Sequence, residues 1–309
     1  MNITFPALDN INVAVNLAYS TQLGAVASKY KPFTYSAAST SSEELYPRLD
    51  LIGGMREWLG DRVVHQLSVS SFAVKNKMFE NTIAVQRTDI EDDRYGFLAQ
   101  GAEQLGQNAG YLPDQMVAQL LANGHATQTY DGQNFFDLAH PNPNSVAGGG
   151  GAGTIANYQP GNGPAWYLID TSKIIKPVIF QMRSPFKIVP RFSMIDPQVF
   201  NNKEFQWGVD GRCNVAFGFW QLMFCSYAPL TMANLDAART AMASIRRPDG
   251  TPMGIKPNML MVPTALYKTA NSWENLEFQP ADAASGVSTL LPNEMKGMFS
   301  AYENEFLNA

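Results

Sequence analysis

Hydrophobic positions near the start of the chain recur at helical spacing. Leu8, Ile11, Val15 and Ala18 lie three or four residues apart and therefore predict one short amphipathic helix. The stretch 36–42 that follows is rich in Ser, Thr and Tyr and has no periodicity. Because such a segment cannot bury a core of its own, we expect residues 1 to about 47 to form an arm that stays loose or lies on a neighbour.

An alternation of apolar and polar positions predicts a two-stranded β-ribbon over residues 61–87. Apolar residues alternate with serines around Leu67, and the pattern returns from Phe79 to Val85. The polar tripeptide Lys75–Asn76–Lys77 is the expected turn between the strands. Since an isolated hairpin is marginal in water, its apolar face needs a partner, which is either the rest of this chain or a second copy.

Apolar residues at spacings of three and four predict a long helix over residues 89–123. Thr88 and Glu91 have the spacing of a capping box at its start, and Gly124 is placed to end it. Pro113 lies inside this pattern and is expected to kink or restart the helix. A helix of this length spans about 50 Å, which suggests a structural strut.

The second half of the chain alternates between strand-like and helical segments after a flexible loop, 141–164, that is rich in Pro, Asn and Gly. The expected strands are 166–169, 177–182, 204–209, 214–227 and 259–262, and the expected helices begin after Thr231 and at Pro263. This order predicts a mixed sheet with covering helices, so the fold class is α+β.

The composition changes this picture in one respect. Charged residues make up 16% of the 309 residues, against about 25% in an average globular domain. A chain so poor in charge is expected to bury surface against other chains, although a merely neutral enzyme has the same composition. Its length allows one elaborate domain or two lobes.

Charge and hydropathy exclude several classes of protein. The formal net charge of -5 leaves no basic face for sequence-independent binding to duplex DNA. No apolar run is long enough for a membrane span, and residues 1–25 lack the pattern of a signal peptide. Cys213 and Cys225 are too few for a disulfide framework. We expect them to be buried free thiols in a chain that folds in a reducing cytoplasm.

The strongest candidate for catalysis is the group Asp131, Asp137 and His140, which could be metal ligands or an acid–base pair. Its spacing matches no specific site, and Asp-Gly and Asp-x-x-His-Pro sequences also stabilise turns. The glycine run 148–153 lacks the Gly-Lys-Ser/Thr ending of a phosphate-binding loop. The interpretation as loop structure is preferred in both cases, and no cofactor or metal is expected.

Two clusters of mixed charge flank the predicted ribbon. They consist of Arg56, Glu57, Asp61 and Arg62 before it and of Arg87, Asp89, Glu91, Asp92, Asp93 and Arg94 after it. These clusters are either a solvated ribbon base with helix-capping acids or ion pairs between copies of the chain, which would set their register.

Residues 54–62 read Gly-Met-Arg-Glu-Trp-Leu-Gly-Asp-Arg. This resembles the Gly-Met-Arg-Glu-Trp-x-Gly-(Asp/Glu)-Arg signature of the Mu-like major head subunit family. Further blocks resemble the same family in the same order, and they are 75–80, 90–96, 130–137 with His140–Pro141, 205–214, 218–221 and 257–263.

The resemblance implies an α+β fold of the Hong Kong 97 type, with an N-terminal arm, an extended β-hairpin loop, a spine helix, and peripheral and axial domains. It implies the divisions 1–50 for the arm, 51–88 for the extended loop and 89–145 for the spine helix and the start of the peripheral domain. Residues 146–309 would form the axial domain with returning peripheral strands.

The implied function is that of a major capsid protein of a tailed phage or Mu-like prophage, without enzymatic activity. Its copies would form hexamers and pentamers of an icosahedral shell that encloses double-stranded DNA without binding specific sequences. Scaffold or protease, portal and decoration proteins of the phage are the implied partners. The virion is the implied location, with assembly in the bacterial cytoplasm.

From charge and expected exposure we predict subunit contacts at three places. The residues are Arg56, Glu57, Asp61 and Arg62 at the ribbon base, Lys75, Lys77 and Phe79 at its tip, and Asp92, Asp93 and Arg94 at the start of the spine helix. Two alternatives stay open at this point. One is a metal-dependent hydrolase or nuclease that uses Asp131, Asp137 and His140, and the other is a tail-tube or decoration protein.

Overall fold

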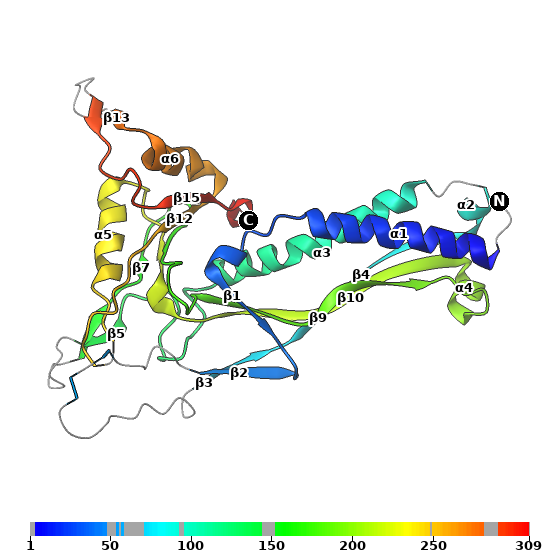
Figure 1. The fold of residues 1–309 in the computed structure, drawn as a ribbon, viewed down its shortest axis with the longest axis horizontal. Helices are drawn as coiled ribbons and strands as arrows, with labels where there is room; N and C mark the ends of the chain where they lie inside the picture. The colour runs from blue at the N-terminus through cyan, green and yellow to red at the C-terminus, as the bar shows by residue number, and fades with distance from the viewer. Residues whose placement is uncertain are drawn as a thin grey trace.

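The computed structural model describes residues 4–47, 54–55, 57–58, 71–92, 96–143, 152–247, 249–280 and 290–308. The molecule is elongated: long strands and two long helices extend towards one end, and a second sheet with shorter helices forms the other end (Figure 1). Each end has its own cluster of buried hydrophobic side chains. The expectation of an α+β fold is confirmed in this arrangement.

The four-stranded sheet at the extended end, called here the long sheet, has the strand order β1-β9-β10-β4. Its strands are β1 (Thr34–Ala38), β4 (Lys77–Gln86), β9 (Val178–Arg191) and β10 (Glu204–Phe217). β10 is antiparallel to both of its neighbours, whereas β1 is parallel to β9. The sheet therefore joins the N-terminal arm to strands from the middle of the chain.

Two helices, α1 (Phe5–Ala25) and α3 (Phe97–Ala122), lie along one side of the long sheet (Figure 1). The buried face of α1 consists of Leu8, Ile11, Val15 and Tyr19, which confirms most of the predicted apolar face. These side chains share a core with Leu98, Phe205 and Trp207. The helix has 21 residues and is longer than the short one expected.

The predicted continuous helix over residues 89–123 is wrong at its start. The structure has a short helix, α2 (Arg87–Glu91), and then α3 from Phe97. Thr88 lies inside α2, whose N-cap is Gln86, so the predicted capping box does not form. Pro113 lies inside α3, which continues through it without a restart to Ala122.

The predicted ribbon is wrong in its pairing. β3 (Ser71–Lys75) pairs with β2 (Glu43–Pro47), and β4 pairs with β10. The expected turn residue Asn76 is buried, where its side chain donates to Ser39 Oγ at 2.9 Å and accepts from Gln181 Nε2 at 2.8 Å. A buried asparagine with these bonds anchors the crossing from one sheet to the other. The first part of the ribbon, 61–70, lies outside the described residues.

The apolar face of β4 is covered by its own chain. Val85 is buried in the core beneath α1 and α3, and Ile83 packs against that core. The arm also lies on its own body, through β1 in the long sheet and through the turn at Lys29 and Tyr30, which α3 holds. The expectation of a loose arm or an arm on a neighbour is wrong for residues 4–47, because pairing with β9 and β3 satisfies their backbone groups.

The second sheet, called here the compact sheet, has the order β15-β12-β8-β11-β7. Its strands are β7 (Tyr158–Gln159), β8 (Trp166–Ile169), β11 (Met223–Ser226), β12 (Met259–Val262) and β15 (Ser300–Glu303). Helices α5 (Met232–Ala243) and α6 (Thr264–Asn275) pack against it. Thr231 caps α5 as expected, because its hydroxyl accepts from the backbone N–H of Asn234 at 3.2 Å.

The predicted strand 214–227 is in fact divided between the two sheets. β10 ends at Phe217, a 3₁₀ turn follows at Trp220–Leu222, and β11 begins at Met223. The shorter elements are α4 (Pro197–Asn202), β5 (His140–Pro143), β6 (Ala152–Ile155), β13 (Phe278–Pro280), β14 (Leu290–Pro292), and 3₁₀ turns at Lys31–Phe33 and Glu305–Asn308.

Cys213 and Cys225 are buried free thiols, as predicted. Burial raises the pKa of Cys213 to about 12, so this thiol is not a nucleophile at neutral pH. None of the helices in the described ranges combines the length and the hydropathy that a membrane crossing requires.

Candidate assembly surfaces

The proposed catalytic group does not form a catalytic site. His140 is fully buried, and its Nδ1 lies 2.7 Å from Asp131 Oδ2 while its Nε2 lies 3.3 Å from the carbonyl oxygen of Phe135. The imidazole stacks on the Trp220 ring at a centroid distance of 3.8 Å. Both ring nitrogens and one ring face are therefore used to hold the loop at 131–140 against the core.

The contact between His140 and Asp131 also affects the pKa of the aspartate. Burial raises the pKa of the Asp131 carboxyl, but the hydrogen bond and charge of His140 and the backbone N–H of Gln133 outweigh it, so that the pKa lies below its usual value. Asp137 accepts from the backbone N–H of Ala139 at 3.0 Å, as in an Asx turn. Among the described residues, no cluster of His, Cys, Asp and Glu could hold a metal ion.

The predicted contact residues are separated in the structure. Lys75 and Lys77 are exposed and flank the buried Asn76, and Phe79 is half-buried. They lie where β3 passes into β4, so they do not form the tip of a ribbon. Asp92 is exposed after α2, which follows the other end of β4, a strand about 30 Å long.

The remaining predicted contacts belong to the ribbon base and the spine start. Glu57 is exposed. The Gly54 N–H donates to Asp249 Oδ2 at 2.7 Å, so Gly54 is held to the turn at 249–250. Arg56, Asp61, Arg62, Asp93 and Arg94 lie outside the described residues.

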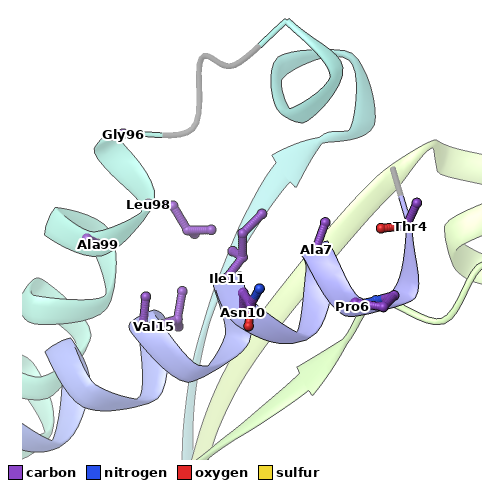
Figure 2. A pocket seen from close by; sticks show the side chains of 10 residues that line it. Thr4, Pro6, Ala7, Asn10, Ile11, Val15, Gly96, Leu98 and Ala99 are labelled. Atoms are coloured by element: carbon purple, nitrogen blue, oxygen red, sulfur yellow. The ribbon is translucent and has the colours of Figure 1, made fainter. Parts of the chain in front are cut away.

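A groove of about 650 Å³ lies between the start of α1 and the start of α3. Figure 2 shows the side chains of Ile11, Val15 and Leu98 between the two helices, with Thr4 and Asn10 nearer the start of α1. None of its described lining residues is titratable. The groove therefore has no acid, base or nucleophile, and its apolar walls suit the insertion of an apolar side chain.

The far end of the long sheet exposes further apolar side chains. Phe5 is 71% exposed, Phe200 in α4 is 77% exposed, and Ile195 in the preceding loop is 92% exposed. Figure 1 shows α4 beside the start of α1 at this end. The sequence patterns did not indicate this surface, because these residues lie in loops and helix ends where periodicity carries no signal.

A comparison with known protein families matches residues 8–305 to the Mu-like prophage major head subunit gpT. The chain is 34% identical to the major capsid protein of Escherichia phage Mu over 283 residues, which is 91% of each chain. It is 33% identical to the Mu-like prophage FluMu major head subunit of Haemophilus influenzae over 301 residues, which is 96% of each.

Solved structures agree with this. A chain of the bacteriophage JBD30 procapsid is 34% identical, with a TM-score of 0.77 over 97% of this chain and 100% of that one. A chain of the JBD30 capsid is 25% identical, with a TM-score of 0.74 over 100% of both chains. These relatives are structural capsid proteins with the Hong Kong 97-type fold, so the resemblance in the sequence is confirmed and the hydrolase or nuclease alternative has no support.

The chain shares its fold with capsid subunits and is similar to them in sequence along nearly its whole length. Its exposed apolar surfaces suit contact with other subunits, and it is therefore a structural component of a phage head. The chain belongs to the Mu-like prophage major head subunit family.

Proposed function

We propose that this head subunit assembles as hexamers and pentamers into a closed icosahedral shell that encloses double-stranded DNA. The observation that carries the proposal is the group of exposed apolar side chains at the far end of the long sheet, where Phe5 is 71%, Phe200 77% and Ile195 92% exposed. A monomer leaves these side chains in water, whereas contact with other copies would cover them.

The character of the surface supports the same proposal. α1 contains one charged residue, Asp9, and α3 contains Glu103 and the buried Asp114. Two long helices with so few charges present an outer surface that is less solvated than usual for a monomer. The apolar side chains at the far end of the long sheet, including Phe200, add to the area that contact with other copies would remove from water.

The net charge of -5 suits a container for DNA, because a wall without excess cations does not hold the packaged duplex tightly. Scaffold or protease, portal and decoration proteins are the further partners that we propose, with assembly in the bacterial cytoplasm. One JBD30 capsid related to this chain carries minor capsid protein trimers, which supports the inclusion of a decoration protein.

The division of the chain into arm, loop, spine and axial parts is part of the proposal. We propose that the extended loop begins and ends at the β2–β3 pair, so that it is shorter than 51–88, because β4 belongs to the long sheet. The predicted contacts also remain proposals. Of these, Glu57, Lys75, Lys77 and Asp92 are exposed and accessible to a neighbour.

Negative-stain microscopy of the purified full-length chain tests the proposal. Closed shells are expected, either with the chain alone or after addition of a scaffold protein. Tubes would instead indicate a tail protein. A chain that stays monomeric at high concentration under both conditions would refute self-assembly.

A further inference from the structure

The long sheet has an edge strand that is unprotected. β4 is the last strand in the order β1-β9-β10-β4, and within the described chain it pairs with β10 alone. The ladder is continuous from Lys77, opposite Cys213, to Gln86, opposite Glu204, and no bulge interrupts it. The strand has 10 residues, which is long for the free edge of a sheet.

The direction of the backbone groups in β4 follows from one hydrogen bond. The Arg87 N–H, just after the strand, donates to the Lys203 carbonyl at 2.8 Å. Because bonding alternates along an antiparallel pair, Val85, Ile83 and the other odd-numbered residues face β10. The residues whose N–H and C=O groups face away from β10 are therefore Met78, Glu80, Thr82, Ala84 and Gln86.

The opposite edge of the same sheet is protected in three ways. β1 covers β9 from Val178 to Met182. Beyond that, Pro185 and Pro190 have no N–H to offer a further strand. The Phe186 carbonyl accepts from the hydroxyl of Tyr19 at 3.1 Å. These features are the usual means by which proteins prevent pairing at a sheet edge.

β4 has none of these protections. It contains no proline, and its charged residues are Lys77 and Glu80. A cleft of about 190 Å³ lies beside it, between the strand and α3, and Leu105 and Leu112 contribute to its wall. An added strand would direct every second side chain towards this cleft. The edge therefore fits an extended segment with apolar residues at alternate positions.

We propose that the free edge of β4 binds an extended strand from a second copy of this chain. This inference rests on the proposed shell function. Every copy in a shell carries the same edge, so only a partner that is present in equal number can cover them all. Another copy of the major subunit meets that condition, whereas a less abundant protein would leave most edges open.

Residue-resolved hydrogen exchange on shells and on dissociated subunits tests the pairing directly. In dissociated subunits the amides of Phe79, Asn81, Ile83 and Val85 are protected, while those of Met78, Glu80, Thr82, Ala84 and Gln86 exchange fast. In shells made from the purified chain alone, the even-numbered set is expected to slow by about 100-fold or more. Equal protection of both sets would show a second ladder.

Two variants with a matched control test the same edge in assembly. Thr82→Pro removes an outward N–H and leaves the ladder with β10 intact, and Ala84→Lys adds a charge at the edge. Val189→Lys adds the same charge to the exposed surface of β9, whose edge is already blocked. Circular dichroism and a cooperative melt verify folding. We expect at least a tenfold loss of shells in the first two variants and normal shells in the control.

The possible failures are distinguishable. Shells with fast-exchanging even-numbered amides, or normal shells from both edge variants, overturn the edge pairing and leave the shell function intact. Loss of shells in Val189→Lys also overturns the edge pairing, because an added charge on the surface of the long sheet, and not at the edge of β4, would then explain the loss of assembly. If the even-numbered amides are protected only when another virion protein is present, that protein is the partner and the pairing between copies is overturned. Failure of the unmodified chain to assemble under any condition overturns the shell function, and the edge pairing with it.

Discussion

Replacement of Asp114 in α3 tests how the end of the N-terminal arm is held. Asp114 is 1% exposed, and its Oδ1 accepts from the backbone N–H groups of Lys29 at 2.9 Å and Tyr30 at 2.8 Å. Its Oδ2 is buried and has no hydrogen-bond partner in the described part of the chain. One oxygen therefore clamps the arm, and the other carries a poorly solvated charge.

These two oxygens predict opposite effects for two substitutions. Asp114→Ala leaves both N–H groups without their acceptor, at about 1–3 kcal/mol each, so the variant should lose about 2–6 kcal/mol of unfolding free energy. Asp114→Asn keeps an acceptor for both N–H groups and removes the buried charge. We expect it to be at least as stable as the unmodified chain at pH 7.

The pH dependence has a definite sign. Burial raises the pKa of the Asp114 carboxyl, and the two backbone hydrogen bonds lower it to a smaller extent, so the pKa in the folded state lies above its usual value. The ionised carboxylate therefore reduces stability at neutral pH, and this cost disappears as the pH falls through the folded-state pKa. Any advantage of Asp114→Asn should shrink on acidification.

Urea unfolding of the unassembled subunit, followed by tryptophan fluorescence at several values from pH 4 to pH 7, measures these differences. The comparison between variants at each pH removes the contribution of the other carboxylates. If Asp114→Asn loses as much stability as Asp114→Ala at pH 7, the negative charge itself holds the arm and the reasoning is refuted.

Three further predictions concern packing and charge elsewhere. A Cβ on Gly124 would lie 2.4 Å from the Phe136 ring, so Gly124→Ala should lower the unfolding free energy, measured by thermal unfolding, by about 1–3 kcal/mol. Gly24 has open space around it, so Gly24→Ala should leave the unfolding free energy undiminished. The pKa of Asp131 is lowered in the folded state, so its carboxylate stabilises the fold at neutral pH and this stabilisation is lost as the pH falls through the folded-state pKa. Asp131→Asn should therefore have a lower unfolding free energy at pH 7 and lose less of it on acidification. An unchanged dependence of the unfolding free energy on pH would contradict this. Tyr19→Phe should cost about 1 kcal/mol in urea unfolding through loss of the bond to β9, and no change would show that this edge is capped by other means.

The sequence predicted buried faces better than it predicted neighbours. The spacing of Leu8, Ile11 and Val15 identified the face of α1 that packs on α3, because helical periodicity is set by burial. Alternation in β4 likewise marked Val85 as buried. Alternation does not specify which strand lies alongside, so β3 and β4 were expected to pair with each other although they belong to different sheets.

Polar residues were the main source of error in the site and the turns. Asn76 stands between two lysines and has the composition of an exposed turn, but tertiary hydrogen bonds to Ser39 and Gln181 bury it. His140, in contrast, lies in a loop whose composition already favoured a structural role, and its side chain contacts Asp131 and stacks on Trp220. Exposed apolar residues in short elements, such as Phe200, have no local pattern that distinguishes them from core residues.

The parallel pairing of β1 with β9 has a consequence for biosynthesis. Thr34 lies opposite Val178, so the ribosome must make more than half of the chain before β1 can join its sheet. α1 likewise waits for α3 before its apolar face is covered. Nascent chains therefore expose Phe33 and the inner face of α1 throughout early translation. We therefore expect folding of this polypeptide during synthesis to depend on chaperones of the host that shield these apolar segments.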